Sequence, residues 1–466
     1  TTLWHTASDV EEILLSAGQT DHFRLHGRVH TEKIKKGIRG AYLLQKNCTI
    51  PAGEKEEYCI VAEVGQENAH VHNLFYQLKE TDREALQEEL YKDVDRGTKN
   101  LVSIVAEADG IQHCGDRLVT ARHFANVLFN VMRGGTFTHG YTVSVNDFLA
   151  HLQRFNTEVY QAVKTSLERS LDKEIRYDAL VEKVADMDHP QLLRLTMEYL
   201  PLTFSRRHGD PSRPWNRFSI NVRDEAGELA YTYQGNWRDI FQNWEALAWS
   251  YPEYLESFVT KFLNASTADG YNPYRITRDG IDWEVFDPED PWSFIGYWGD
   301  HQVIYLLKLL ELTEKFYPGK LHRWMDQSRF VFANVPYRIK PYSEITKDPN
   351  LTITFDAELH KKLLDLSATL GADGKLLRDA DGQLHLSSLL EKLLIMVLTK
   401  LSNFIPGAGI WMNTQRPEWN DANNALVGNG VSMVTLYYLR RFLVFIKKLL
   451  VNDPGNTFTV KQEVAA

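Results

Sequence analysis

The segment with the greatest potential for chemistry is residues 415–424, with the sequence QRPEWNDANN, near the end of the chain. It combines carboxylates, side-chain amides, a guanidinium and an indole within a short stretch. A long apolar run at 431–450 follows it and predicts a buried helix. Polar groups this dense beside a core helix must be solvated, paired with each other or directed at a ligand. We favour a ligand and take Asp421 as the first candidate for chemistry.

A second polar segment predicts a helix that begins near Trp237. In such a helix Arg238, Gln242 and Glu245 lie on one stripe, because side chains three and four residues apart share a face. This stripe could be a surface network of ion pairs. The nearby tryptophans and the first-turn pair of Arg238 and Asp239 favour a wall that contacts a sugar.

Three further clusters, rich in arginine, aspartate, glycine and aromatic residues, complete the predicted pocket. One contains Trp298 and then Asp300 just before an expected apolar helix, which Asp300 would alternatively cap. Another holds four arginines at 206–217, where Arg213 could clamp an anionic group or join a cluster of salt bridges. Arg133 opens the third, glycine-containing cluster.

The sequence lacks the signatures of metal and nucleophile chemistry. His70 and His72 would share one face of a predicted strand, but spacing suggests no third ligand, so we predict no metal site. Zinc-protease, serine-hydrolase, P-loop and dinucleotide-binding motifs are also absent. Carboxylate chemistry remains. Cleavage of a glycosidic bond uses a protonated carboxyl at the glycosidic oxygen, and an inverting hydrolase adds a second carboxylate about 6.5–9.5 Å away.

The composition suits a sugar ligand. Aromatic residues form 12% of the chain, and many of them lie beside Asp, Asn, Arg or Gly. A pyranose stacks its C–H face on an indole and offers hydroxyl groups to amides, carboxylates and guanidinium groups. The net charge of −10 and the lack of a basic stripe argue against a nucleic-acid partner. Since no uncharged apolar run reaches the roughly 18 residues of a membrane helix, we also expect no membrane partner.

The cysteines and the first residue bear on location. The cysteines are odd in number and form no CxxC pair; they are Cys48, Cys59 and Cys114. This pattern predicts reduced thiols and a cytoplasmic protein. The chain starts with Thr1 and not with Met, so we expect further domains of the same polypeptide as a partner.

The elements that would position these residues follow from the periodicity of the sequence. Strand signals lie at 41–44, 58–65 and 71–78. A capping-box sequence at 81–84 then starts a helix that continues to about residue 93. Helical periodicity predicts these further helices: 119–132, 145–171, 180–184, 191–200, 237–249, 252–263, 300–316, 357–370, 387–403 and 431–450.

This order of elements predicts a mainly α protein, with an (α/α)6 toroid, complete or incomplete, preceded by a partial β-sandwich. The predicted domains are a sandwich-like segment at 1–80 and a toroid at 81–466, with an insertion around 340–385. In a toroid the connections at one end are free to form a pocket, so we expect the polar clusters to gather there.

Three short motifs resemble a known family. Trp419-Asn420-Asp421 before a glycine-containing loop resembles a segment of the inverting disaccharide phosphorylases that act on cellobiose and chitobiose. The Arg238-Asp239 pair with Gln242 is similar to their Arg-Asp-x-x-Gln element, and also to a helix in the amylo-1,6-glucosidase part of glycogen debranching enzymes. Both groups belong to the six-hairpin (α/α)6 glycosidases. Asp300 before an apolar helix agrees with the same pattern.

The resemblance implies that Asp421 is the general acid and that Arg238, Asp239, Asp300 and Trp419 bind the adjacent sugar. Glu418 stands where the phosphorylases have Asp, and Ala422 where they have Gly. The motifs supply no candidate for the catalytic base. Other residues are added to these because of their chemistry alone. The full predicted substrate-binding set is Trp419, Asn420, Glu418, Arg238, Asp239, Trp237, Asp300, Trp298, Arg133 and Arg213.

We therefore predict an inverting carbohydrate-active enzyme that cleaves a glycosidic bond in an oligosaccharide, with Asp421 as the general acid. A glucosidase-like hydrolase is slightly favoured over a glycoside phosphorylase. We predict no cofactor, except inorganic phosphate in the case of a phosphorylase. The alternative is a non-catalytic carbohydrate-binding or scaffold module of a larger protein, which would share the aromatic pocket and need no acid.

Overall fold

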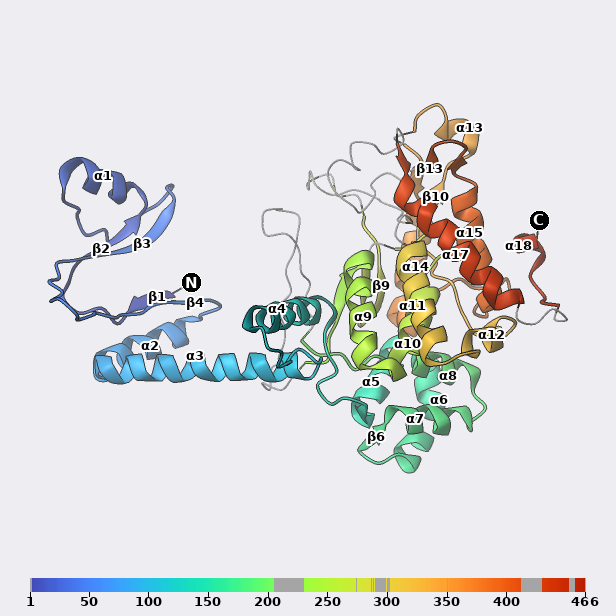
Figure 1. Cartoon of the computed structure of the whole chain (residues 1–466), viewed down its shortest axis with the longest axis horizontal. Coiled ribbons are helices and arrows are strands. Elements are labelled where there is room, and N and C mark those ends of the chain that lie inside the picture. Colours follow the sequence, from blue (N-terminus) through green and yellow to red (C-terminus); the bar gives the residue numbers. More distant parts are fainter. Residues whose placement is uncertain are drawn as a thin grey trace. The chain divides into compact units, whose positions relative to one another are not determined.

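The chain forms two compact units, Thr1–Ser103 and Ile104–Ala466, which are described separately (Figure 1). The computed structural model describes residues 2–204, 230–273, 275–285, 287, 289, 299, 302–349, 351–411, 430–451 and 457–465, with only the backbone of 238, 239 and 302. The described structure is mainly helical with small antiparallel sheets, as the sequence predicts. The predicted domain boundary near residue 80 and the insertion at 340–385 stay predictions.

The first unit holds two separate two-stranded sheets where the sequence predicts part of a β-sandwich. Strand β1 (Thr2–His5) pairs antiparallel with β4 (Ile60–Glu63). Strand β2 (Val10–Ser16) pairs with β3 (Gly40–Lys46), and helix α1 (Gly18–His26) lies between them in sequence. Two of the predicted strand segments, 41–44 and 58–65, are thus confirmed as containing strands.

The third predicted strand is wrong, because residues 71–78 belong to helix α2 (Asn68–Glu80). Valine and aromatic residues gave this segment its strand-like composition. Leu74 and Leu78, four residues apart, are its half-buried positions, which is the spacing of a helix face. His70 and His72 consequently lie on a helix and not on a strand.

Helix α3 (Arg83–Ala106) starts where predicted but runs longer than the predicted 81–93. Its cap also differs. Thr81 ends α2, and the Asp82 carboxylate accepts a hydrogen bond from the Glu84 backbone N–H at 3.0 Å.

The second unit contains most of the helices. They are α4 (Arg117–Gly134), α5 (Val145–Phe155), α6 (Thr157–Ser170), α7 (Tyr177–Ala185), α8 (Pro190–Met197), α9 (Trp237–Ser250), η1 (Pro252–Tyr254), α10 (Leu255–Asn264), α11 (Gln302–Phe316), α12 (Lys320–Trp324), α13 (Tyr342–Ile345), α14 (Ala357–Leu370), η2 (Ala372–Lys375), α15 (Leu389–Leu401), α17 (Met433–Val451) and α18 (Gln462–Ala465). Each helix predicted beyond residue 100 overlaps one of these, whereas α12, α13 and α18 were not predicted.

Short antiparallel strands lie between these helices. They form the pair β5 (Thr142–Ser144) and β6 (Glu174–Arg176), the pair β10 (Tyr337–Ile339) and β11 (Ile353–Phe355), and the two three-stranded sheets β7 (Gln234–Asn236), β8 (Arg275–Thr277), β9 (Gly280–Asp282) and β12 (Phe404–Ile405), β13 (Gly409–Trp411), β14 (Val431–Ser432). Several of them immediately precede a helix, so they fix where that helix begins.

The predicted helix 145–171 is interrupted at Asn156. Its backbone is extended, with φ −152°, and its side-chain oxygen accepts a hydrogen bond from the Val159 N–H at 3.0 Å. The break lets α6 start as a new helix with a capped N-terminus.

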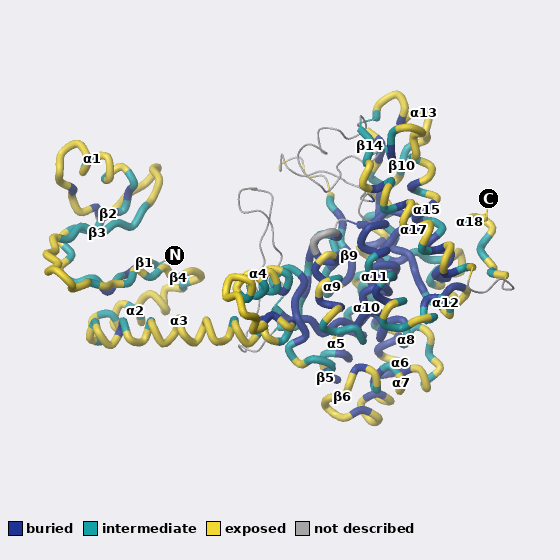
Figure 2. Tube along the Cα trace, in the orientation of Figure 1, coloured by how far each residue is buried: buried dark blue, intermediate teal, exposed yellow. Residues whose placement is uncertain are grey.

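The core of the second unit centres on α9 and α10. Trp237 lies 4.9 Å from Phe262 and Trp244 lies 5.3 Å from Phe258, measured between ring centroids. The order of these pairs shows that α10 runs antiparallel to α9 after the short η1 turn. All four rings are fully buried, and Figure 2 shows α10 mainly in the colour of buried residues.

Candidate active site

Helices α9 and α11 pack side by side and run in the same direction. The Tyr305 hydroxyl donates to Gln242 Oε1 at 3.4 Å, and Lys308 Nζ donates to Glu245 Oε2 at 2.9 Å. The two residues of each pair lie 63 positions apart in the sequence. A step of three residues along α9 therefore matches a step of three residues in the same direction along α11, so the helices are parallel. The polar stripe predicted on α9 therefore pairs across to α11.

Helix α17 is also parallel to α11. Near the middle of both, Arg441 Nε donates to Glu311 Oε1 at 3.0 Å, a hydrogen bond that raises the pKa of the Arg441 guanidinium. Beyond their C-terminal ends, the rings of His322 and Phe458 pack with centroids 5.9 Å apart. The N-terminal ends of α9, α11 and α17 consequently lie on one side of this helical layer.

Short sheets hold the chain at this end. Strand β7 leads directly into α9, and β14 leads directly into α17. The ladder between β13 and β14 ends with Trp411 opposite Val431, just before the start of α17. Thr203 likewise bridges Tyr231, just before β7.

Most predicted site residues fall outside the described residues. These are Asp421, Trp419, Asn420, Glu418, Asp300, Trp298 and Arg213. The backbone of Arg238 and Asp239 forms the first turn of α9, but their side chains are not described. The roles of Arg238 and Asp239 stay predictions, and so do the roles of the seven residues outside the described part of the chain.

Two predicted site residues are described in full. Trp237 has no exposed surface, and its indole also packs against Phe241 at 5.1 Å, so its visible role is to hold the first turn of α9 in the core. The Arg133 guanidinium lies 4.2 Å from the centre of the Phe129 ring on its own helix, α4. Sugar contacts by either side chain stay predictions.

The segment before α11 contains a feature that the sequence analysis missed. A Cβ atom on Gly299 would lie 2.5 Å from Lys400 Nζ and 2.8 Å from Tyr271 Cδ1, so only glycine fits there. Lys400 is almost fully buried, and its ammonium lies 4.9 Å from the centre of the Tyr271 ring. A single lysine near the end of an apolar helix was the available signal. This cation lies next to the residue that precedes Asp300.

A buried polar network joins α8 to the rest of the second unit. Arg194 forms ion pairs with Asp373 and, at 2.9 Å, with Glu198. Asn156 donates to Asp373 at 2.8 Å, and Asn264 donates to Glu198 at 2.6 Å. Each of these side chains is buried, so the network fixes the position of α8 against α10 and η2.

Helix α8 and Asn156 of this network lie in a stretch of the chain that resembles a known family. Residues 137–201 match the model of glycoside hydrolase family 149 insertion domain 1. This match supports a glycoside hydrolase or glycoside phosphorylase, as the sequence predicts. No curated protein matches the chain.

Among the described residues, no group of three or more His, Cys, Asp or Glu side chains is arranged to hold a metal ion. None of the described helices is long and apolar enough to span a membrane.

Proposed function

We propose that the chain catalyses inverting cleavage of a glycosidic bond in an oligosaccharide, with Asp421 as the general acid. The observation that carries this proposal is the parallel packing of α9, α11 and α17. Support comes from the backbone of Arg238 and Asp239 in the first turn of α9, and from the described starts of α11 and α17, the helices that follow Asp300 and Asp421 in the chain, because these N-terminal ends share one side. Convergence of carboxylates, a guanidinium and indoles is the composition expected of a sugar-cleaving site.

The toroid belongs to the same proposal. In an (α/α)6 toroid, successive helices alternate in direction, so every second helix runs parallel. Parallel α9 and α11, with α10 returning antiparallel to α9, support such an arrangement.

In the proposed mechanism Asp421 donates its proton to the glycosidic oxygen while an acceptor attacks the anomeric carbon from the opposite face. Arg238, Asp239 and Asp300 bind hydroxyl groups of the sugar, and Trp419 stacks on its ring. A general acid must be protonated at the working pH, so we expect apolar enclosure and the neighbouring Glu418 to raise the pKa of Asp421.

The test is the Asp421→Asn variant, compared with Asp381→Asn on an exposed turn. Loss of a general acid should lower turnover of an oligosaccharide about 10²–10⁴-fold. A glycosyl fluoride, whose leaving group needs no proton, should lose much less. Near-wild-type cleavage of the oligosaccharide by Asp421→Asn would contradict the assignment.

The acceptor is resolved by product analysis. Hydrolysis releases reducing sugar whether or not phosphate is present, whereas phosphorolysis produces sugar 1-phosphate only when phosphate is supplied. The proposal for Asp421 covers both reactions, because each requires protonation of the same oxygen. The inverted configuration of the product can be read by NMR immediately after the reaction.

A further inference from the structure

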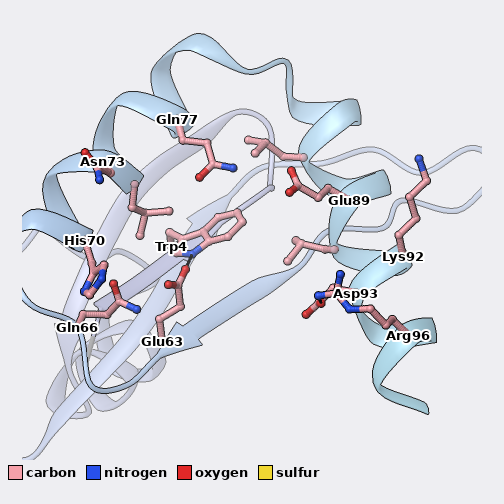
Figure 3. A pocket seen from close by; sticks show the side chains of 13 residues that line it. Trp4, Glu63, Gln66, His70, Asn73, Gln77, Glu89, Lys92, Asp93 and Arg96 are labelled. Carbon is pink, nitrogen blue, oxygen red and sulfur yellow. Dashed lines mark hydrogen bonds and ion pairs between the residues drawn. The ribbon is translucent and has the colours of Figure 1, made fainter. Parts of the chain in front are cut away.

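The first unit contains a pocket of about 540 Å³ between β1, β4 and the helices α2 and α3. Figure 3 shows Trp4 between the two helices, with polar side chains of both around it. A volume of this size lies within the range of small-molecule sites, about 300–1,000 Å³.

The floor of the pocket is a fixed indole. Trp4 is only 9% exposed, and its indole N–H donates to Glu63 Oε1 at 2.7 Å across the β1–β4 pair. Leu74, Leu86 and Leu90 extend the apolar floor. An indole whose edge is already hydrogen-bonded can offer its apolar face, which is the surface that stacks on the C–H face of a sugar ring.

The walls carry side chains that suit hydroxyl groups. Asn73 and Gln77 are four residues apart on α2 and lie on the same face, while Glu89 reaches the pocket from α3 (Figure 3). All three are exposed, and among the described residues their side chains have no hydrogen-bond partner. Amides offer a donor and an acceptor side by side and carboxylates accept two bonds, as vicinal sugar hydroxyls require.

The charges around the pocket argue for a neutral ligand. Lys92 is paired with Glu88 at 2.7 Å, and Arg96 is paired with Asp93 on the same helix. An anionic ligand would have to displace these carboxylates and would meet Glu63 and Glu89 as well.

We propose that this pocket is a binding site for a neutral oligosaccharide, formed entirely by the first unit and distinct from the site that contains Asp421. The ligand class follows from the indole floor and the amide and carboxylate walls. The proposal goes beyond the proposed function, because binding here requires no bond cleavage.

The experiment uses the whole 466-residue chain carrying Asp421→Asn, so that the sugar is not consumed. Four-unit glucose oligosaccharides with α-1,4, β-1,4 or β-1,3 linkages are added in turn, and hydrogen–deuterium exchange is followed by mass spectrometry. At least one of them should protect peptides of α2 and α3. Inorganic phosphate alone should not protect them, and protection by phosphate would identify an anion site and contradict the proposal.

Asn73→Leu removes one wall group, and Asn100→Leu makes the same change at an exposed α3 residue that does not line the pocket. Loss of one hydrogen-bonding side chain should weaken binding about tenfold in the first variant and not in the second. Equal affinities, or no protection of α2 and α3 by any of the three sugars, would overturn the proposal. Both results are read from α2 and α3 and not from released product, so they are distinct from a failure of Asp421 as the acid, which would appear as consumption of the sugar by the Asp421→Asn chain.

Discussion

At the scale of single residues, His151 shows how burial sets a protonation state. It is 3% exposed, its ring centroid lies 5.2 Å from that of Tyr199, and its Nε2 lies 3.0 Å from the Leu195 carbonyl oxygen. Since a carbonyl only accepts, Nε2 carries the hydrogen. Burial lowers the pKa of His151 well below its ordinary value, and the nearby positive charge of Lys261 lowers it further.

We therefore expect His151 to make stability depend on pH. Above pH 6.5 the residue is neutral in both states. Below about 6.5 the unfolded chain takes up a proton that the folded chain does not, so stability falls as pH falls, by up to about 1.4 kcal/mol per pH unit. The free energy of unfolding, measured with urea at several pH values between 7.5 and 5.0, should fall less steeply with falling pH for His151→Gln than for the wild type.

The control is His139→Gln, at an exposed position that also lies within residues 137–201. This variant should keep the wild-type dependence of stability on pH. If His151→Gln also kept it, the buried imidazole would not be the source of the pH dependence.

At the scale of elements, the Arg194–Asp373 pair is the link between α8 and η2. Both side chains are nearly inaccessible, at 2% and 1% exposure. A charge left alone in such a place costs far more than the net value of the pair. We expect Arg194→Met to lower the free energy of unfolding by about 3–5 kcal/mol, measured by urea denaturation.

The double variant Arg194→Met, Asp373→Leu should recover part of this loss, because no uncompensated carboxylate remains at the second position. The exposed pair of Arg176 and Asp178 is the control, and Arg176→Met should change stability little. A loss in Arg194→Met no larger than in Arg176→Met would show that the buried network does not hold these elements together.

Helices α14 and α2 show where secondary structure could and could not be predicted from local sequence. Helix α14 was predicted with its observed ends, because its apolar residues keep the helical period and Asp356 caps its first turn. Helix α2 was mistaken for a strand, since the segment is short and Val71, Phe75 and Tyr76 suggest a strand by composition while all three are exposed. Strand propensity describes side chains that fit a half-buried sheet surface, and these exposed side chains do not lie on one.

The candidate site likewise has features that local sequence predicts and features that depend on distant contacts. Arg238 and Asp239 could be placed in the first turn of α9 from spacing alone. The pairing of Glu245 with Lys308, which defines the direction of α11, depends on a contact between residues distant in sequence. Lys400 was missed for the same reason: a lysine near the end of an apolar helix could be noticed in the sequence, but its proximity to Gly299 is created by the fold.

At the scale of the whole molecule, the two units differ greatly in their buried apolar surface. The buried hydrophobic side chains of the first unit are Trp4, Leu14, Val29 and Leu86, whereas the second unit buries many more, including whole aromatic clusters around α9. The first unit also exposes Leu25, Ile34 and Val64, each by at least 75%. Burial of apolar surface is the main favourable term in folding.

We therefore expect two separate unfolding transitions in urea. The first unit should unfold at the lower concentration and with the smaller dependence on denaturant, because it exposes less new surface. Pulsed hydrogen exchange with mass spectrometry can assign each transition, with peptides from α2 and α3 reporting the first unit and peptides from α10 and α11 the second. An oligosaccharide bound between α2 and α3 should move the first transition upwards, by about 1.4 kcal/mol at ten times its dissociation constant for this pocket. A single transition reported by all four helices would mean that the first unit draws its stability from contacts beyond its own sparse core.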